Sequence, residues 1–87
     1  MYSVSLRISD TDRSYDIAHL VQIGCRYPCS VTIQNNLGAY DVKSIMGMMS
    51  MNPRDGVLNI RADGPQEREA VEEICAFFEE SLHISRT

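Results

Sequence analysis

The stretch VLNIRADGPQEREAVEEICAFFEESL, residues 57–82, decides the fold. Val57 to Ala62 is predicted to be a strand, and Asp63-Gly64-Pro65 has the composition of a turn. The segment from Gln66 to about Leu82 is the strongest predicted helix, because its apolar residues recur on one stripe. That stripe consists of Ala70, Val71, Ile74, Phe77, Phe78 and Leu82. We therefore expect one face of this helix to be buried and the glutamate-rich face to be solvated.

Two further elements are predicted at the N-terminal end of the chain. Residues 2–8 alternate, with Val4, Leu6 and Ile8 on one side, which is typical of a half-buried strand. Residues 15–26 carry apolar residues at helical spacing, and either Ser14 or Asp16 is suited to cap the helix at its start.

The middle of the chain predicts a hairpin followed by a short helix. Residues 29–34 alternate, residues 35–38 (NNLG) have turn composition, and residues 39–42 form a second short strand. Ser44 then opens a methionine-rich segment that is long enough for about two helical turns.

These elements follow the order β-α-β-β-α-β-α. They predict one α+β domain over residues 1–87, an open-faced two-layer sandwich. Its sheet has four mostly antiparallel strands, with three helices on one face.

Composition narrows the class of function. The chain has 87 residues, with 8 Lys and Arg against 12 Asp and Glu, a formal net charge of −4. An acidic chain argues against nucleic acid as a partner, since phosphate contacts need clustered cations. No stretch approaches the roughly 20 apolar residues of a membrane span. We expect a small cytoplasmic protein without membrane or nucleic-acid partners, a binding module or carrier and not a stand-alone enzyme.

The cysteines predict neither disulfides nor a metal site. Cys25, Cys29 and Cys75 form an odd set, which favours a reducing environment and free, buried or half-buried thiols. Cys25 and Cys29 have no second close pair to complete the four ligands of a structural zinc site. We therefore expect no metal and no cofactor.

The string VKSIMGMMSM, residues 42–51, resembles the regulatory segment of the histidine-containing phosphocarrier protein, HPr, of the bacterial sugar phosphotransferase system. The similarity extends without gaps to Leu20-Val21-Gln22 upstream. Downstream it includes Gly56, Ile60, Ala62, Gly64, Glu67 and the run Ala70-Val71-Glu72. The resemblance implies the HPr fold, which has the same element order.

The chain departs from this family at the phosphotransfer motif, His-x-Arg-Pro-Ala, which opens the first helix of HPr proteins. The five corresponding positions hold Arg13, Ser14, Tyr15, Asp16 and Ile17. Arg13 stands in place of the histidine, and a guanidinium stays protonated and cannot accept a phosphoryl group. Asp16 would also repel an incoming phosphate. The resemblance therefore implies a member without a catalytic residue, like the family's catabolite-repression paralogue Crh.

Two other residues are candidates for phosphorylation. His19 lies six positions beyond Arg13, more than one and a half turns along the helix, and is expected to be an ordinary surface or interface residue. Ser44 resembles the serine that HPr kinase/phosphorylase modifies, with Lys43 as an adjacent cation. Ser44 is equally suited to be a plain helix cap, so both interpretations stay open.

The resemblance also implies a docking face. About half of the apolar residues in the methionine-rich segment should be exposed beside the first helix. Its expected partners are the kinase, phosphotransferase enzymes or a transcriptional regulator; the oligomeric state is not predicted. The alternatives are a phosphocarrier with a non-standard acceptor and a pure interaction module. The expected face consists of Ala18, His19, Gln22, Ile45, Met46 and Met49.

Overall fold

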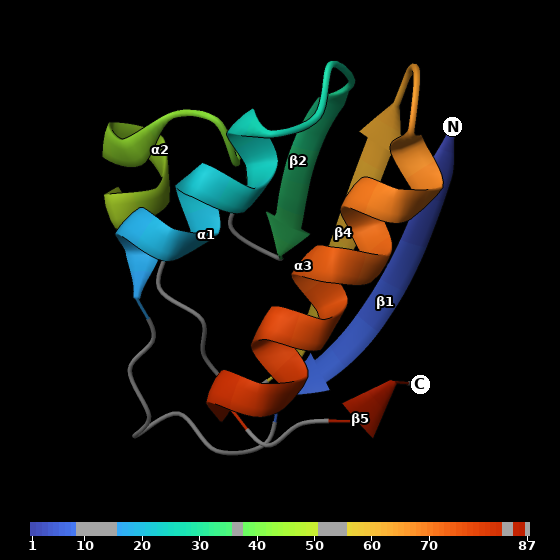
Figure 1. The fold of residues 1–87 in the computed structure, drawn as a ribbon. Helices are drawn as coiled ribbons and strands as arrows, with labels where there is room; N and C mark the ends of the chain where they lie inside the picture. Colours follow the sequence, from blue (N-terminus) through green and yellow to red (C-terminus); the bar gives the residue numbers. More distant parts are fainter. Residues whose placement is uncertain (9–15, 36–37, 51–55, 83–84, 87) are drawn as a thin grey trace.

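The fold is an open-faced sandwich of one antiparallel sheet and three helices (Figure 1). The structure is a computed structural model of residues 1–87 and describes residues 1–8, 16–35, 38–50, 56–82 and 85–86. The strands are β1 (Tyr2–Ile8), β2 (Ser30–Asn35), β3 (Gly38–Asp41), β4 (Gly56–Asp63) and β5 (Ser85–Arg86). They lie in the order β3-β2-β4-β1-β5. The helices are α1 (Ile17–Cys25), α2 (Ile45–Ser50) and α3 (Glu67–Leu82).

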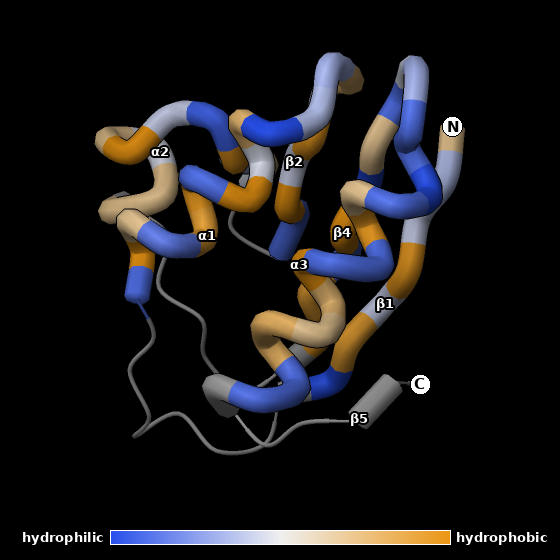
Figure 2. The backbone as a smooth tube through the Cα atoms, in the orientation of Figure 1, coloured by the Kyte–Doolittle hydropathy of each residue, from blue (hydrophilic) through white to orange (hydrophobic). Residues whose placement is uncertain are grey.

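Alternation along the strands determines which side of the sheet is buried. β4 pairs with β1 on one side and β2 on the other, so Val4, Ile60 and Ile33 lie opposite one another across three strands. Leu6 likewise lies opposite Leu58, and both are buried. Figure 2 shows hydrophobic and hydrophilic residues alternating along β1. The period of two places the apolar set on one face, which the helices cover.

Helix α3 closes the core over the central strands, and it packs against β1, β4 and α1. Ala70, Val71, Ile74 and Phe78 are buried as the stripe predicts, and Cys75 joins them. Phe77, also on the predicted stripe, is only half-buried at the junction with α1. Leu82 lies in α3, but its side chain is outside the described set.

The predicted fold class is confirmed, with differences at element ends. A fifth strand, β5, pairs with β1 and was not predicted, because two residues cannot display alternation. Asp16, one of two candidate caps, is the N-cap of α1, and Ser14 lies outside the described residues. No helix in the described ranges is long and apolar enough to cross a membrane.

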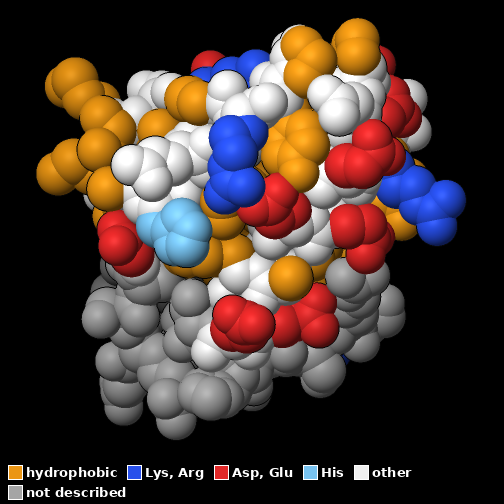
Figure 3. All heavy atoms as spheres, viewed as in Figure 1, with side chains coloured by type: hydrophobic (Ala, Val, Ile, Leu, Met, Phe, Trp, Pro, Cys, Tyr) orange, Lys and Arg blue, Asp and Glu red, His pale blue; other side chains and the backbone are white. Residues whose placement is uncertain are grey.

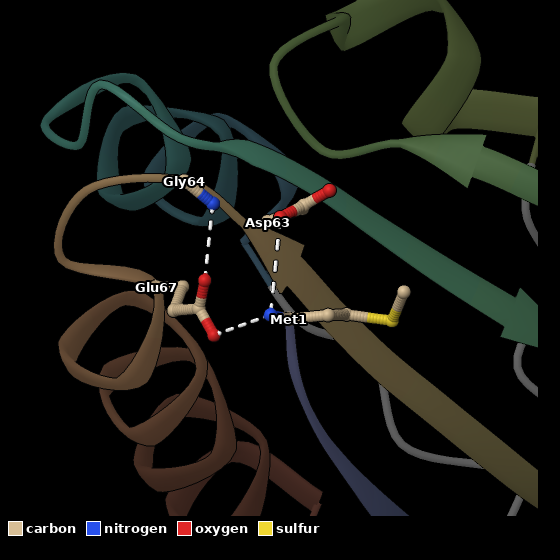
Figure 4. A network of polar contacts seen from close by, with 4 residues as sticks. All are labelled: Met1, Asp63, Gly64 and Glu67. Atoms are coloured by element: carbon tan, nitrogen blue, oxygen red, sulfur yellow. Dashed lines mark hydrogen bonds and ion pairs between the residues drawn. The ribbon is translucent and has the colours of Figure 1, made fainter.

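A small polar network ties the start of β1 to the β4–α3 turn (Figure 4). The Met1 ammonium lies 2.8 Å from Glu67 Oε2 and 3.8 Å from the Asp63 carboxylate. Glu67 Oε1 accepts a hydrogen bond of 3.1 Å from the Gly64 amide, in a turn where Gly64 has a φ of 130°. The ammonium and the Gly64 amide lower the pKa of Glu67, and Glu67 in turn raises the pKa of the ammonium.

These shifts predict how Glu67→Gln changes stability with pH. The lowered pKa of Glu67 stabilises the fold above its ordinary value of 4.5, and this contribution is lost as pH falls through the folded value. The raised pKa of the ammonium stabilises below 8.0, and its contribution is lost as pH rises through the folded value. Glu67→Gln should therefore lower the unfolding temperature most between pH 4.5 and pH 8.0, where both groups are charged.

Thermal unfolding of both proteins across the pH range measures this difference. Asp63→Asn is the matched control and should have a smaller effect, since Asp63 lies farther from the ammonium. If the difference in unfolding temperature between wild type and Glu67→Gln stays constant from acid to alkaline pH, the ion pair between Glu67 and the Met1 ammonium does not stabilise the fold as described.

Candidate functional site

Ser44 caps helix α2, as the sequence predicts. Its Oγ accepts a hydrogen bond of 3.2 Å from the Gly47 amide, and its carbonyl accepts one of 2.9 Å from the Met48 amide. The Ser44 side chain is half-buried, so part of it stays open to solvent. A capping hydroxyl of this kind contributes about 1 kcal/mol to the helix.

Lys43, the predicted adjacent cation, is held by the end of helix α1. Its Nζ donates a hydrogen bond of 2.7 Å to the Tyr27 carbonyl, and its amide donates one of 2.9 Å to the Asp41 carboxylate. A cation beyond the last turn of a helix is favourable, because the exposed carbonyls there carry partial negative charge. Lys43 therefore fastens the segment before α2 to the end of α1.

Close packing between Gly24 and Val42 also holds α1 against the segment before α2. A Cβ on Gly24 would lie 2.7 Å from Val42 Cγ1, closer than side-chain atoms pack. Both residues are buried, and Val42 directly precedes Lys43. The absence of a side chain at Gly24 lets α1 lie against the chain that leads into α2.

This packing places the exposed residues of α1 and α2 side by side. Met48 is fully buried, whereas Ile45, Met46 and Met49 are 47%, 78% and 67% exposed. Figure 3 shows hydrophobic side chains gathered at the α2 end of the molecule. Met51 lies outside the described residues. The residues that are expected to form a docking face are all exposed, and the set keeps that name: Ala18, His19, Gln22, Ile45, Met46 and Met49.

The start of α1 is already occupied by a carboxylate of the chain itself. Asp16 Oδ1 accepts a hydrogen bond of 3.1 Å from the His19 amide. This amide is one of the few backbone donors that a helix start offers to an anion. Ile17 follows, half-buried against the core, while Arg13, Ser14 and Tyr15 lie outside the described residues.

Helices α1 and α3 meet through aromatic and charged contacts that sequence reasoning missed. The His19 and Phe77 rings are edge-to-face, with centroids 5.4 Å apart. The Tyr27 hydroxyl donates to Glu73 Oε1, and this carboxylate raises the pKa of Tyr27. Arg26 Nη1 lies 2.8 Å from the other oxygen of Glu73. No local pattern could reveal these pairs, because some 46 positions separate Tyr27 from Glu73.

The cysteines differ in part from expectation. All three are free, with Cys29 and Cys75 buried, but Cys25 is exposed. The buried face of α1 consists of Leu20, Ile23 and Gly24. Cys25, the last residue of the helix, lies outside this face. In the described residues, no three His, Cys, Asp or Glu side chains gather into a metal site.

Comparison with protein families identifies the chain's relatives. The family model described as the PTS HPr component phosphorylation site matches residues 16–80, most of the chain. The chain belongs to the HPr family. HPr proteins are phosphocarriers of the sugar phosphotransferase system. The match begins at Asp16, so it leaves out Arg13.

Solved structures of HPr proteins share the fold. HPr of Mycoplasma is 24% identical, with a TM-score of 0.84 over 97% of this chain and 99% of that chain. The HPr-C-His protein of Thermoanaerobacter tengcongensis is 23% identical, with a TM-score of 0.80 over 95% and 97%. Crh of Bacillus subtilis, a catabolite repression protein, is 26% identical, with a TM-score of 0.67 over 86% and 92%. No curated protein sequence matches significantly.

The contact between Gly24 and Val42 predicts opposite outcomes for two glycines. Gly24→Ala should lower the free energy of unfolding by about 1 kcal/mol, because overpacking outweighs the helix preference of alanine. Gly47→Ala is the matched control, since its Cβ would meet Ser44 Oγ at 3.4 Å, which is ordinary contact. That variant should be neutral or stabilising. Urea unfolding measures both, and a stabilised Gly24→Ala protein would contradict the packing argument.

Proposed function

We propose that this HPr-family protein is a regulatory docking protein that has lost histidine phosphotransfer and is controlled by phosphorylation of Ser44. The observation that carries the proposal is the exposure of Met46 and Met49 beside a partly accessible Ser44. Exposed methionines adapt to partner surfaces of different shape. Because the Ser44 hydroxyl lies next to this surface and is only half-buried, a phosphate on it would alter the docking of a partner.

The start of α1 supports the loss of phosphotransfer. A phosphohistidine in an HPr protein needs an acceptor imidazole and helix donors that steady its charge. Here Arg13 replaces the histidine, and the Asp16 carboxylate takes a first-turn amide and adds negative charge. His19, the nearest imidazole, packs against Phe77 on the α3 side.

A phosphate on Ser44 would act mainly through its charge. It would add about −1.5 to −2 charges next to the exposed methionines of α2. An apolar partner surface that binds the unmodified face would be repelled, whereas a cationic one would be attracted. We infer protein partners of the kinds known for this family: HPr kinase/phosphorylase, a phosphotransferase enzyme or a transcriptional regulator. We further infer a cytoplasmic protein, one domain over residues 1–87, without a cofactor.

Incubation with HPr kinase/phosphorylase and ATP should phosphorylate Ser44. Mass spectrometry of proteolytic fragments should find one added phosphate on the peptide that contains Ser44. The Ser44→Ala variant should take up none, and Ser50→Ala, a serine in the same helix, should be modified as the wild type is. An unmodified wild-type protein would contradict control by this kinase.

Incubation with phosphoenolpyruvate and the first enzyme of the phosphotransferase system tests the other half of the proposal. We expect no label. An acid-labile phosphate on His19 would instead identify a phosphocarrier with a non-standard acceptor. Blank results in both assays would leave a pure interaction module.

Met46→Asp should weaken binding of purified HPr kinase/phosphorylase by about tenfold or more, as loss of a central apolar contact does. Isothermal titration measures the affinity. Val57→Asp is the matched control, because Val57 is another exposed apolar residue, at 44%, but lies in strand β4 away from α2. Equal losses in the two variants would contradict a docking role for α2.

A further inference from the structure

A groove between helices α1 and α3 lies next to the docking face. It has a volume of about 180 Å³ and is lined by His19 and Ile23 of α1 and by four residues of α3. The α3 residues are Glu73, Ala76, Phe77 and Glu80. His19 belongs to both the groove and the docking face, so a protein that covers the face reaches the groove.

The lining combines apolar surface with carboxylates. Ala76 and Phe77 offer aliphatic and aromatic surface above the nearly buried Ile23, while Glu73 and Glu80 carry carboxylates. Such a surface suits a long cationic side chain, whose methylene stem packs on apolar groups while its head pairs with a carboxylate. Phosphate groups of lipids or nucleic acids would be repelled.

The charges around the groove are unbalanced. Helix α3 contains six glutamates and one arginine, and its last turn has no basic residue. Glu80 lies near this end, where the helix dipole also disfavours an anion. Three basic side chains described on or beside the helices already have contacts: Arg26 with Glu73, Lys43 with the Tyr27 carbonyl, and Arg68 with the Tyr2 ring. A cation supplied by a partner would be favourable beside Glu80, at the negative end of the helix dipole.

The chain itself shows that a guanidinium suits this place. Arg26 lies 2.8 Å from one oxygen of Glu73 at the edge of the groove. A second guanidinium could pair with Glu80 and stack on Phe77, and arginine does both better than lysine because its head is planar.

We propose that the α1–α3 groove binds an arginine side chain of the protein that docks on the adjacent face. The identity of that protein rests on the proposed function, but the chemistry of the groove does not. The partner surface would then be apolar where it meets α2 and would carry an arginine where it crosses α1 toward α3.

Titration of the ¹⁵N-labelled protein with N-acetyl-arginine amide tests the groove directly. The backbone amide signals of Ala76, Phe77 and Glu80 should shift and saturate at tens of millimolar. N-acetyl-citrulline amide, the neutral isostere, should shift them far less. Glu80→Gln should weaken arginine binding about two- to five-fold, as loss of one exposed ion pair with ring contact does. Glu69→Gln, an exposed glutamate of the first turn of α3, should leave it unchanged.

Equal shifts with citrulline, no saturable shift, or an equal effect of Glu69→Gln would each overturn the inference. Shifts that depend on protein concentration without arginine would also overturn it and indicate a second copy of the chain as the occupant. The titration is independent of the kinase. If arginine does not bind but Met46→Asp still weakens kinase binding, the groove proposal is refuted and the docking function stands. If arginine binds but Met46→Asp has no effect, only the docking function is refuted.

Discussion

The structure depends on the burial of one face of its sheet. Val4, Ile60 and Ile33 meet across three antiparallel strands, and Phe78 of α3 is buried in the same core. A register slip of one residue in β1 would turn Val4 and Leu6 outward and destroy this core. Because α3 takes up the space over β1 and β4, α1 and α2 are left to one side with their outer residues exposed (Figure 1).

The strength of each local pattern explains how much could be predicted from the sequence. Alternation in β1 and the stripe on α3 identified the two central elements, and Ser44 was identified as a cap from its position alone. The strand β5 has too few residues for any pattern. The contacts of Glu73 with Arg26 and Tyr27 join distant parts of the chain, so they depend on tertiary packing that no local pattern encodes.

The start of α1 carries a capping carboxylate of its own. The matched region begins at Asp16, and the same residue supplies the carboxylate that caps the helix. A helix start can bind an external anion only while its amides are unoccupied. Asp16 stabilises the start of the helix, and its carboxylate leaves one fewer first-turn amide for an external anion.

The exposed surface of the helices has an apolar part on α2 and an acidic part on α3, with His19 of α1 between them. Hydrophobic side chains gather at α2 and acidic ones over α3 (Figure 3). The two cations beside α1 already have partners within the chain. Arg26 pairs with Glu73, and Lys43 donates a hydrogen bond to the Tyr27 carbonyl. Charges that are already paired add little to association, whereas like charges across an interface exclude wrong partners. An acidic surface would therefore be repelled by α3, whereas an apolar surface would fit the exposed side chains of α2.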